Sequence, residues 1–158
     1  MAKSSKANVV IDLLNEVLTS ELTAINQYFL HAELCEHWGY KKLYQFIRKQ
    51  SIDEMKHAEK LIERILYLDG IPNVQRMGKV TIGQTVPEQF KLDFALEKEA
   101  VDRLNKGVET CCDAGDHGTK LLIQEILASE EEHMDWLGQQ LELIAKIGEV
   151  NYLTQQIG

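Results

Sequence analysis

The sequence predicts an all-α protein: a four-helix bundle with one long crossover and a short C-terminal helix. Three observations favour this fold. The 158 residues contain only two prolines, Pro72 and Pro87, so long helices are possible. Apolar residues recur at alternating steps of three and four through four stretches, which is the spacing of a buried helix face. Glycines cluster between those stretches, where helices end. We therefore expect one domain over residues 1–158.

The first two predicted helices cover residues 8–38 and 40–69. The apolar face, or seam, of the first runs through Val10, Leu14, Val17, Glu21, Ala24 and Tyr28. The seam of the second runs through Leu43, Ile47, Gln50, Glu54, His57, Leu61, Ile65 and Leu68. Only Gly39 separates the two helices. So short a link makes them antiparallel neighbours.

Residues 71–86 are predicted to form an extended connection, because they contain Pro72, Gly78, Gly83 and a run of β-branched residues. A connection of this length lets the helices on either side of it run parallel. The resulting layout is up-down-down-up with one crossover.

The last two long helices are predicted over residues 87–114 and 117–147, with a short helical piece over 151–156. The third seam runs through Phe90, Phe94, Glu97, Val101, Leu104, Val108 and Cys111. The fourth runs through Ile123, Ile126, Glu130, His133, Leu137, Leu141 and Ile144. Each seam therefore contains at least one acidic residue among apolar ones.

The composition excludes several classes of partner. The net charge of −8 and the pI of about 5.1 argue against nucleic acid and anionic lipid, and they suit attraction of cations. No apolar run approaches 18 residues, and Asp12 and Glu16 interrupt the apolar region near the start, so we expect neither a membrane span nor a signal peptide. Three cysteines without a C-x-x-C pair fit a reducing compartment and ordinary packing. We expect a cytoplasmic protein.

The sequence contains two copies of Glu-x-x-His, a motif suited to metal binding. Glu54 and His57 form one copy, and Glu130 and His133 form the other. Residues three apart on a helix lie on the same face, so both side chains of a copy are able to bind one metal ion. The two remaining seams hold a single carboxylate each, Glu21 and Glu97.

An isolated Glu on a helix is usually solvated, and a lone His on an apolar face is more often a hydrogen-bonded core residue than a ligand. Here four carboxylates lie on four buried seams, where unpaired charge costs several kcal/mol, and no seam carries Lys or Arg. Two divalent cations would balance four Glu. We therefore predict a dinuclear site with the ligands Glu21, Glu54, His57, Glu97, Glu130 and His133.

An oxygen-rich set of ligands without thiolate favours iron or manganese over copper or structural zinc. Glu54 and Glu130 are placed to bridge the two ions, with Glu21 beside His57 and Glu97 beside His133 as terminal pairs. Two Fe(II) ions together supply two electrons, so the natural reaction is oxidation of Fe(II) to Fe(III) by dioxygen or peroxide.

Several runs of the sequence resemble the bacterioferritins, the haem-containing ferritins of bacteria. They are Asn26-Gln27-Tyr28-Phe29-Leu30-His31-Ala32, Ser51-Ile52-Asp53-Glu54-Met55-Lys56-His57-Ala58, Ile62-Glu63-Arg64-Ile65-Leu66 and Asn151-Tyr152-Leu153. The resemblance covers nearly the whole chain and matches the family's six metal ligands without a gap. It implies a ferritin-like bundle in a hollow shell of 24 subunits, each with two iron ions at a ferroxidase centre. The shell would store ferric mineral, for iron storage and detoxification.

Met55 belongs to a second, partly apolar stripe of its helix. Because it lies about 100° round the helix from Glu54, it cannot share the bundle interior with both metal ligands. From the pattern alone, such a Met is usually packing material. The resemblance implies instead that Met55 is an axial ligand of haem b shared between two subunits. It also implies that a small ferredoxin donates electrons for iron release.

The sequence departs from the family at Lys49, where well-studied bacterioferritins have a histidine facing the cavity. Asp53, the neighbour of that position, is retained. Because Lys is a cation and a poor ferrous ligand, an additional iron site on the cavity side is in doubt. Tyr28 and Trp136 lie near the predicted centre as candidate electron donors, although aromatic seam residues are more often core.

Two other functions stay open from the sequence. One is a non-storage di-iron oxidase or peroxidase, although a rubrerythrin-type peroxidase would normally carry a C-x-x-C module that is absent here. The other is a mainly structural, haem-carrying shell subunit with a slow centre. The sequence leaves open whether the shell contains one kind of subunit or two.

Overall fold

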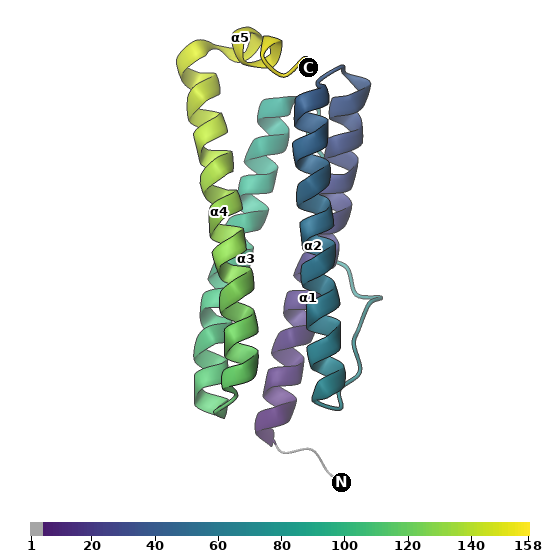
Figure 1. The fold of residues 1–158 in the computed structure, drawn as a ribbon, viewed down its shortest axis with the longest axis vertical. Coiled ribbons are helices and arrows are strands. Elements are labelled where there is room, and N and C mark those ends of the chain that lie inside the picture. Colours follow the sequence, from purple (N-terminus) through teal and green to yellow (C-terminus); the bar gives the residue numbers. More distant parts are fainter. Residues whose placement is uncertain (1–4) are drawn as a thin grey trace.

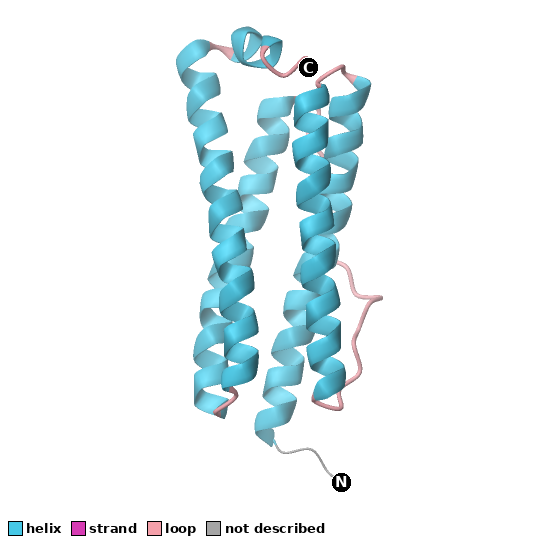
Figure 2. Ribbon diagram, in the orientation of Figure 1, coloured by secondary structure: helices cyan, strands magenta, loops and turns pink. Residues whose placement is uncertain are grey.

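The computed structural model describes residues 5–158, which are all-α and contain no strand (Figures 1 and 2). The helices are α1 Ser5–His37, α2 Lys41–Tyr67, α3 Val86–Ala114, α4 His117–Ile147 and α5 Glu149–Thr154. The predicted fold class is thus confirmed, and the four long helices begin and end within a few residues of their predicted bounds. None of the helices in this range has an apolar stretch long enough to cross a bilayer.

The bundle consists of two antiparallel pairs. Helix α1 packs along α2, helix α3 packs along α4, and the pairs meet mainly through α1 and α3. Figure 1 shows the four long helices side by side, with α5 lying across the end of the bundle where α4 finishes. The crossover, residues 68–85, returns the chain along the outside of the bundle, so that α2 and α3 run parallel. This is the predicted up-down-down-up layout.

Local sequence explains where the second pair of helices begins and ends. Helix α3 starts at Thr85, whose hydroxyl accepts a hydrogen bond from the Glu88 amide, with a proline in the first turn. It stops at Gly115, which has φ of +69°, a conformation that glycine adopts without strain. The next residue, Asp116, caps α4 by accepting from the Thr119 amide at 3.0 Å.

The apolar core is split into two clusters by a polar layer. One cluster surrounds Leu14, Leu61, Leu104, Ile123 and Ile126. The other surrounds Tyr28, Leu43, Phe90, Leu137 and Tyr152. On each long helix, the predicted metal ligands fall between the residues of one cluster and those of the other. The polar layer is therefore enclosed above and below by close-packed apolar side chains.

A regular set of polar side chains on α1 holds the crossover in place. We call it the α1 ladder; its members, four residues apart, are Asn15, Thr19, Thr23, Gln27 and His31. Its hydrogen bonds join Asn73 N to Asn15 Oδ1 (2.8 Å), Arg76 Nε to Thr19 Oγ1 (3.0 Å), Gly78 N to Thr23 Oγ1 (2.9 Å), Thr81 N to Gln27 Oε1 (3.2 Å) and Gly83 N to His31 Nε2 (3.0 Å). Residues i and i+4 lie above one another on a helix, so successive turns of α1 hydrogen-bond to successive parts of the crossover, from Asn73 to Gly83.

Candidate metal centre

All six predicted ligands meet in the polar layer at the middle of the bundle. The four glutamates are each at most 2% exposed, and they come from four different helices: Glu21, Glu54, Glu97 and Glu130. His133 is 7% exposed, and the side chain of His57 is 14% exposed. Because the seams place these residues at the same height, ligand atoms from distant parts of the chain face one another.

The ligand atoms form two overlapping groups, and within each group they lie within 4.8 Å of one another. The first group contains Glu21, Glu54, His57 and Glu130. The second contains Glu54, Glu97 and His133. Glu54 belongs to both groups, which suits the bridging role expected of it. Glu130 belongs only to the first group, so its bridging role stays a prediction.

Each histidine lies beside the glutamate expected to share a metal with it. His57 Nδ1 is 3.8 Å from Glu21 Oε2 and 3.2 Å from Glu130 Oε1. His133 Nδ1 is 2.9 Å from Glu97 Oε1. The hydroxyl of Tyr28 also donates a hydrogen bond to Glu97.

The four glutamates repel one another in a dry environment. Burial raises the pKa of Glu21 and Glu130, and it raises the pKa of Glu54 and Glu97 well above the ordinary value. The buried Oε2 atoms of Glu21 and Glu97 accept no hydrogen bond. Within residues 5–158, no Lys or Arg forms an ion pair with any of the four. The site is thus short of positive charge, the defect that two divalent cations would correct.

The pKa of His57 is raised as well, but for a different reason. Burial alone lowers the pKa of an imidazole, but hydrogen bonds with Glu130, Glu21 and Glu54 outweigh burial and raise the pKa of His57 to about 12. In the metal-free protein, the centre therefore holds protons strongly. Metal ions have to displace these protons, so their affinity should rise with pH.

We expect the metal-free protein to become less stable as pH rises from about 5 to 8. The folded-state pKa values of the four glutamates are raised, so folding favours their protonated form, and its stabilisation is lost as pH rises from the ordinary value of 4.5 through the raised values. The raised pKa of His57 acts in the same direction. Thermal unfolding of the metal-free protein across this range measures the effect, and saturating Mn²⁺ should remove it. A melting temperature that climbs with pH without metal would contradict the account.

Comparison with known proteins identifies the family. The ferritin-like domain model matches residues 11–147. The chain is 52% identical over 148 residues to a bacterioferritin of Streptomyces coelicolor, covering 94% of this chain and 89% of that one. It is 51% identical over 146 residues to a bacterioferritin of Mycobacterium tuberculosis, covering 92% of each chain. The chain belongs to the bacterioferritin family. A bacterioferritin of Brucella melitensis is 46% identical over 143 residues, 90% of this chain and 89% of the relative.

In this bacterioferritin, Tyr28 and Trp136 both lie against the candidate centre. The ring of Tyr28 meets that of His133 edge-on, with centroids 5.2 Å apart. Trp136 stacks on Phe46 at 3.9 Å and lies 6.4 Å from His133. Both aromatic rings are therefore in the right place for the role expected of them, while electron donation itself stays a prediction.

The departure from the bacterioferritin pattern at Lys49 has a clear structural result. A pocket between α2 and α4 is lined by Lys49, Asp53 and Glu132, and His133 forms part of its wall. The Lys49 ammonium lies 2.9 Å from Asp53 Oδ2. The ammonium thus lies beside the carboxylate, at a position where the family has a histidine. Doubt about a further iron site on this side stays a prediction.

Met55 lies outside the bundle, as its place on the helix predicts. Its side chain is 55% exposed, and Leu66 on the same stripe of α2 is 56% exposed. Ile52 and Ile62, also on this stripe, are half-buried. The thioether is thus free of the core and available to a ligand or to a second subunit of the bacterioferritin.

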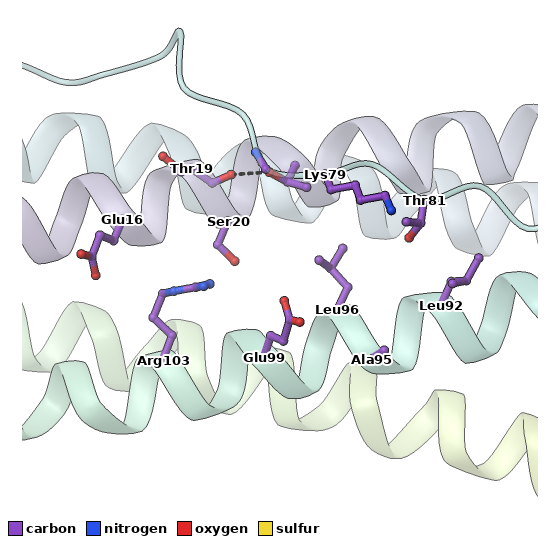
Figure 3. Close-up of a pocket in the computed structure, with 12 residues that line it drawn as sticks. Glu16, Thr19, Ser20, Lys79, Thr81, Leu92, Ala95, Leu96, Glu99 and Arg103 are labelled. Atoms are coloured by element: carbon purple, nitrogen blue, oxygen red, sulfur yellow. Dashed lines mark hydrogen bonds between the residues drawn. The ribbon is translucent and has the colours of Figure 1, made fainter.

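A second groove lies between α1, α3 and the crossover and is separate from the candidate centre. Figure 3 shows Ser20 of α1 facing Glu99 and Arg103 of α3 across it, with Lys79 of the crossover beside α1. None of the six predicted ligands lines this groove. Two acidic and two basic side chains line it, so its formal charges cancel and favour neither cations nor anions.

Proposed function

We propose that this protein is an iron-storage ferroxidase, in which Fe(II) is oxidised to Fe(III) at the six-ligand centre and the product is kept as ferric mineral. One observation carries the proposal: four buried glutamates and two histidines converge where no Lys or Arg of residues 5–158 forms an ion pair with them. Two Fe(II) ions bring four positive charges to four carboxylates. Oxidation of the pair releases two electrons, which dioxygen takes up with two protons to give hydrogen peroxide. Peroxide is an alternative oxidant at the same site.

The ligands have distinct roles in this proposal. Glu21 with His57, and Glu97 with His133, hold one ion each, and Glu54 and Glu130 lie between the two. The close-packed apolar clusters above and below exclude bulk water, which strengthens the attraction between the carboxylates and the iron substrate. Tyr28 and Trp136 are positioned to supply electrons to the centre.

The proposed assembly is a shell of 24 copies, working in the cytoplasm. A lone subunit would leave large apolar side chains in water, among them Phe29, Tyr67, Ile71, Val150 and Ile157. Burial between subunits would remove such side chains from water. The cysteines, all free, suit a reducing compartment.

The proposed cofactor is haem b, held by Met55 from each of two subunits across a two-fold axis. The exposed thioether on a partly apolar face fits this group, since thioether is a known axial ligand of haem iron and the macrocycle needs apolar surroundings. Bound there, the haem would carry electrons between the outside and the stored iron, and a small ferredoxin is the proposed donor. The role of Met55 would be to hold the haem iron through its thioether sulfur.

Native mass measurement tests storage against the non-storage oxidase. A shell of 24 copies of the 18.1 kDa chain has a mass of about 430 kDa, and aerobic addition of Fe(II) should load it with far more iron than two ions per subunit. A dimer that turns over Fe(II) without retaining iron would instead support a di-iron oxidase or peroxidase. A shell that neither oxidises nor retains iron would leave only the structural role.

A further inference from the structure

A buried carboxylate outside the metal centre lies at the junction of α1, α3 and the crossover. Asp93 of α3 is 2% exposed and is not among the metal-ligand groups. Its Oδ1 atom accepts a hydrogen bond from Gln27 Nε2 at 2.8 Å and lies 2.9 Å from His31 Nδ1. No Lys or Arg of the described chain pairs with it. Burying a carboxylate without a cationic partner costs free energy. The two contacts with Gln27 and His31 therefore indicate the role of Asp93.

The two partners of Asp93 are fixed at their other ends by the crossover. The Thr81 amide donates to Gln27 Oε1, and the Gly83 amide donates to His31 Nε2. Since Nε2 of His31 accepts a hydrogen bond, the ring proton of the neutral form is on Nδ1, the ring nitrogen that lies 2.9 Å from Asp93 Oδ1. This close polar contact does not have the geometry of a hydrogen bond. The backbone of the crossover thus orients both side chains, and both side chains converge on one oxygen of α3.

Asp93 is one helical turn from Glu97, and Tyr28 lies between Gln27 and His31 on α1. The same face of α1 therefore contacts two successive carboxylates of α3, the first through Gln27 and His31 and the second through the Tyr28 hydroxyl. Glu97 in turn contacts His133. The α1–α3 contact is less extensive than the contact within either helix pair, so these few polar bonds matter for the relative position of α1 and α3.

We propose that Asp93 is a positioning residue for one half of the metal centre. Together with Gln27 and His31 it holds α3 at a set height against α1, so that Glu97 and Tyr28 lie where the Glu97–His133 site requires them. The Glu21–His57 site takes Glu21 from α1 and Glu54 and His57 from α2, two helices that pack extensively without Asp93, and it shares Glu130 of α4. This inference rests on the proposed function, since it assumes that both sites bind metal.

Cobalt binding to single-site variants tests this role. Co²⁺ is titrated into the full-length protein and followed by its visible absorption, which depends on the ligands. His57→Ala leaves the Glu97–His133 site, and adding Asp93→Ala should weaken Co²⁺ binding there by about tenfold, the lower end of the effect of outer partners of metal ligands. His133→Ala leaves the Glu21–His57 site, and adding Asp93→Ala should change its affinity less than twofold. Equal losses at the two sites, or no loss at either, would overturn the proposal.

Two further variants separate positioning from general loosening of the fold. Asp93→Asn keeps Oδ1 as the acceptor for Gln27 and as the polar neighbour of His31, so it should restore most of the affinity, and it serves if Asp93→Ala fails to fold. A loss with Asn as large as the expected tenfold would refute the hydrogen-bonding role. Thr23→Val removes a bond between α1 and the crossover without touching Asp93, and it should leave both sites unchanged. A wild-type protein that binds fewer than two Co²⁺ per subunit would overturn the proposed function, and this inference with it.

Discussion

Replacing Glu54 with Gln is expected to lower the rate of aerobic Fe(II) oxidation by roughly 100-fold or more, since loss of even an outer partner of a metal ligand costs about 10- to 100-fold in affinity or activity. Glu54 belongs to both ligand groups, so both metal positions lose an anionic oxygen.

The same change should make the metal-free protein more stable, by about 1 kcal/mol or more. Burial raises the pKa of Glu54, and Gln fills the same volume without the charge. Stopped-flow absorbance measures the first effect, and thermal unfolding the second.

Glu54→Gln should lower the oxidation rate but raise the stability of the metal-free protein, and this combination distinguishes a metal ligand from a residue that supports the fold. A residue that merely supports the fold would lose activity and stability together, whereas a metal ligand loses activity and gains stability without metal. Glu59→Gln is the matched control, because Glu59 is exposed on the same helix, and it should alter neither quantity. The same pair of results is expected for Glu130→Gln. Unchanged oxidation kinetics in both variants would show that the centre is assigned to the wrong residues.

Replacing Met55 with Leu is expected to abolish the haem absorption band while leaving Fe(II) oxidation at the wild-type rate. Leu has nearly the volume of Met and is equally apolar, but it offers no atom that binds iron. In the proposed arrangement two subunits share each haem, so every haem site would lose both axial ligands. The oxidation rate should be unaffected, since Met55 is exposed and points away from the centre. Visible spectra of the protein, both as purified and after reconstitution with haem, provide the measurement.

Met77→Leu is the control for this second experiment, because Met77 is a half-exposed methionine of the crossover. It should keep the full haem band. An unaltered band in Met55→Leu would mean that the haem binds elsewhere, and a wild-type protein that never takes up haem would remove the cofactor from the proposal. Slower Fe(II) oxidation in Met55→Leu would mean that the outer face and the centre are coupled.

The fold and the place of the candidate ligands follow from helical periodicity. The alternation of three and four residues that puts Leu14 and Leu61 in the core puts Glu21 and Glu54 there as well, so the same pattern predicts both the bundle and the six residues at its centre. Helix ends are readable because Thr85, Gly115 and Asp116 have strong positional preferences. The exposed position of Met55 follows from the same helical geometry.

Contacts made by the irregular crossover are not readable in this way. Thr19 and Thr23 look like ordinary surface residues of a helix, because their partners lie more than 50 residues away in a segment without periodicity. The pairing of His31 with Asp93 is hidden for the same reason. Their spacing of four with Asn15 and Gln27 was the available indication, but polar residues at that spacing usually face water.

The α1 ladder should make the crossover, residues 68–85, intolerant of inserted residues, although it is the longest loop among the described residues. Surface loops ordinarily accept extra residues at little cost, because closure entropy grows slowly with length. Here the ladder residues, about one 5.4 Å turn of α1 apart, each accept a hydrogen bond from a particular donor in the crossover. One inserted residue would move every later donor away from its acceptor on α1. A peptide or label grafted onto this protein should therefore be placed outside residues 73–83.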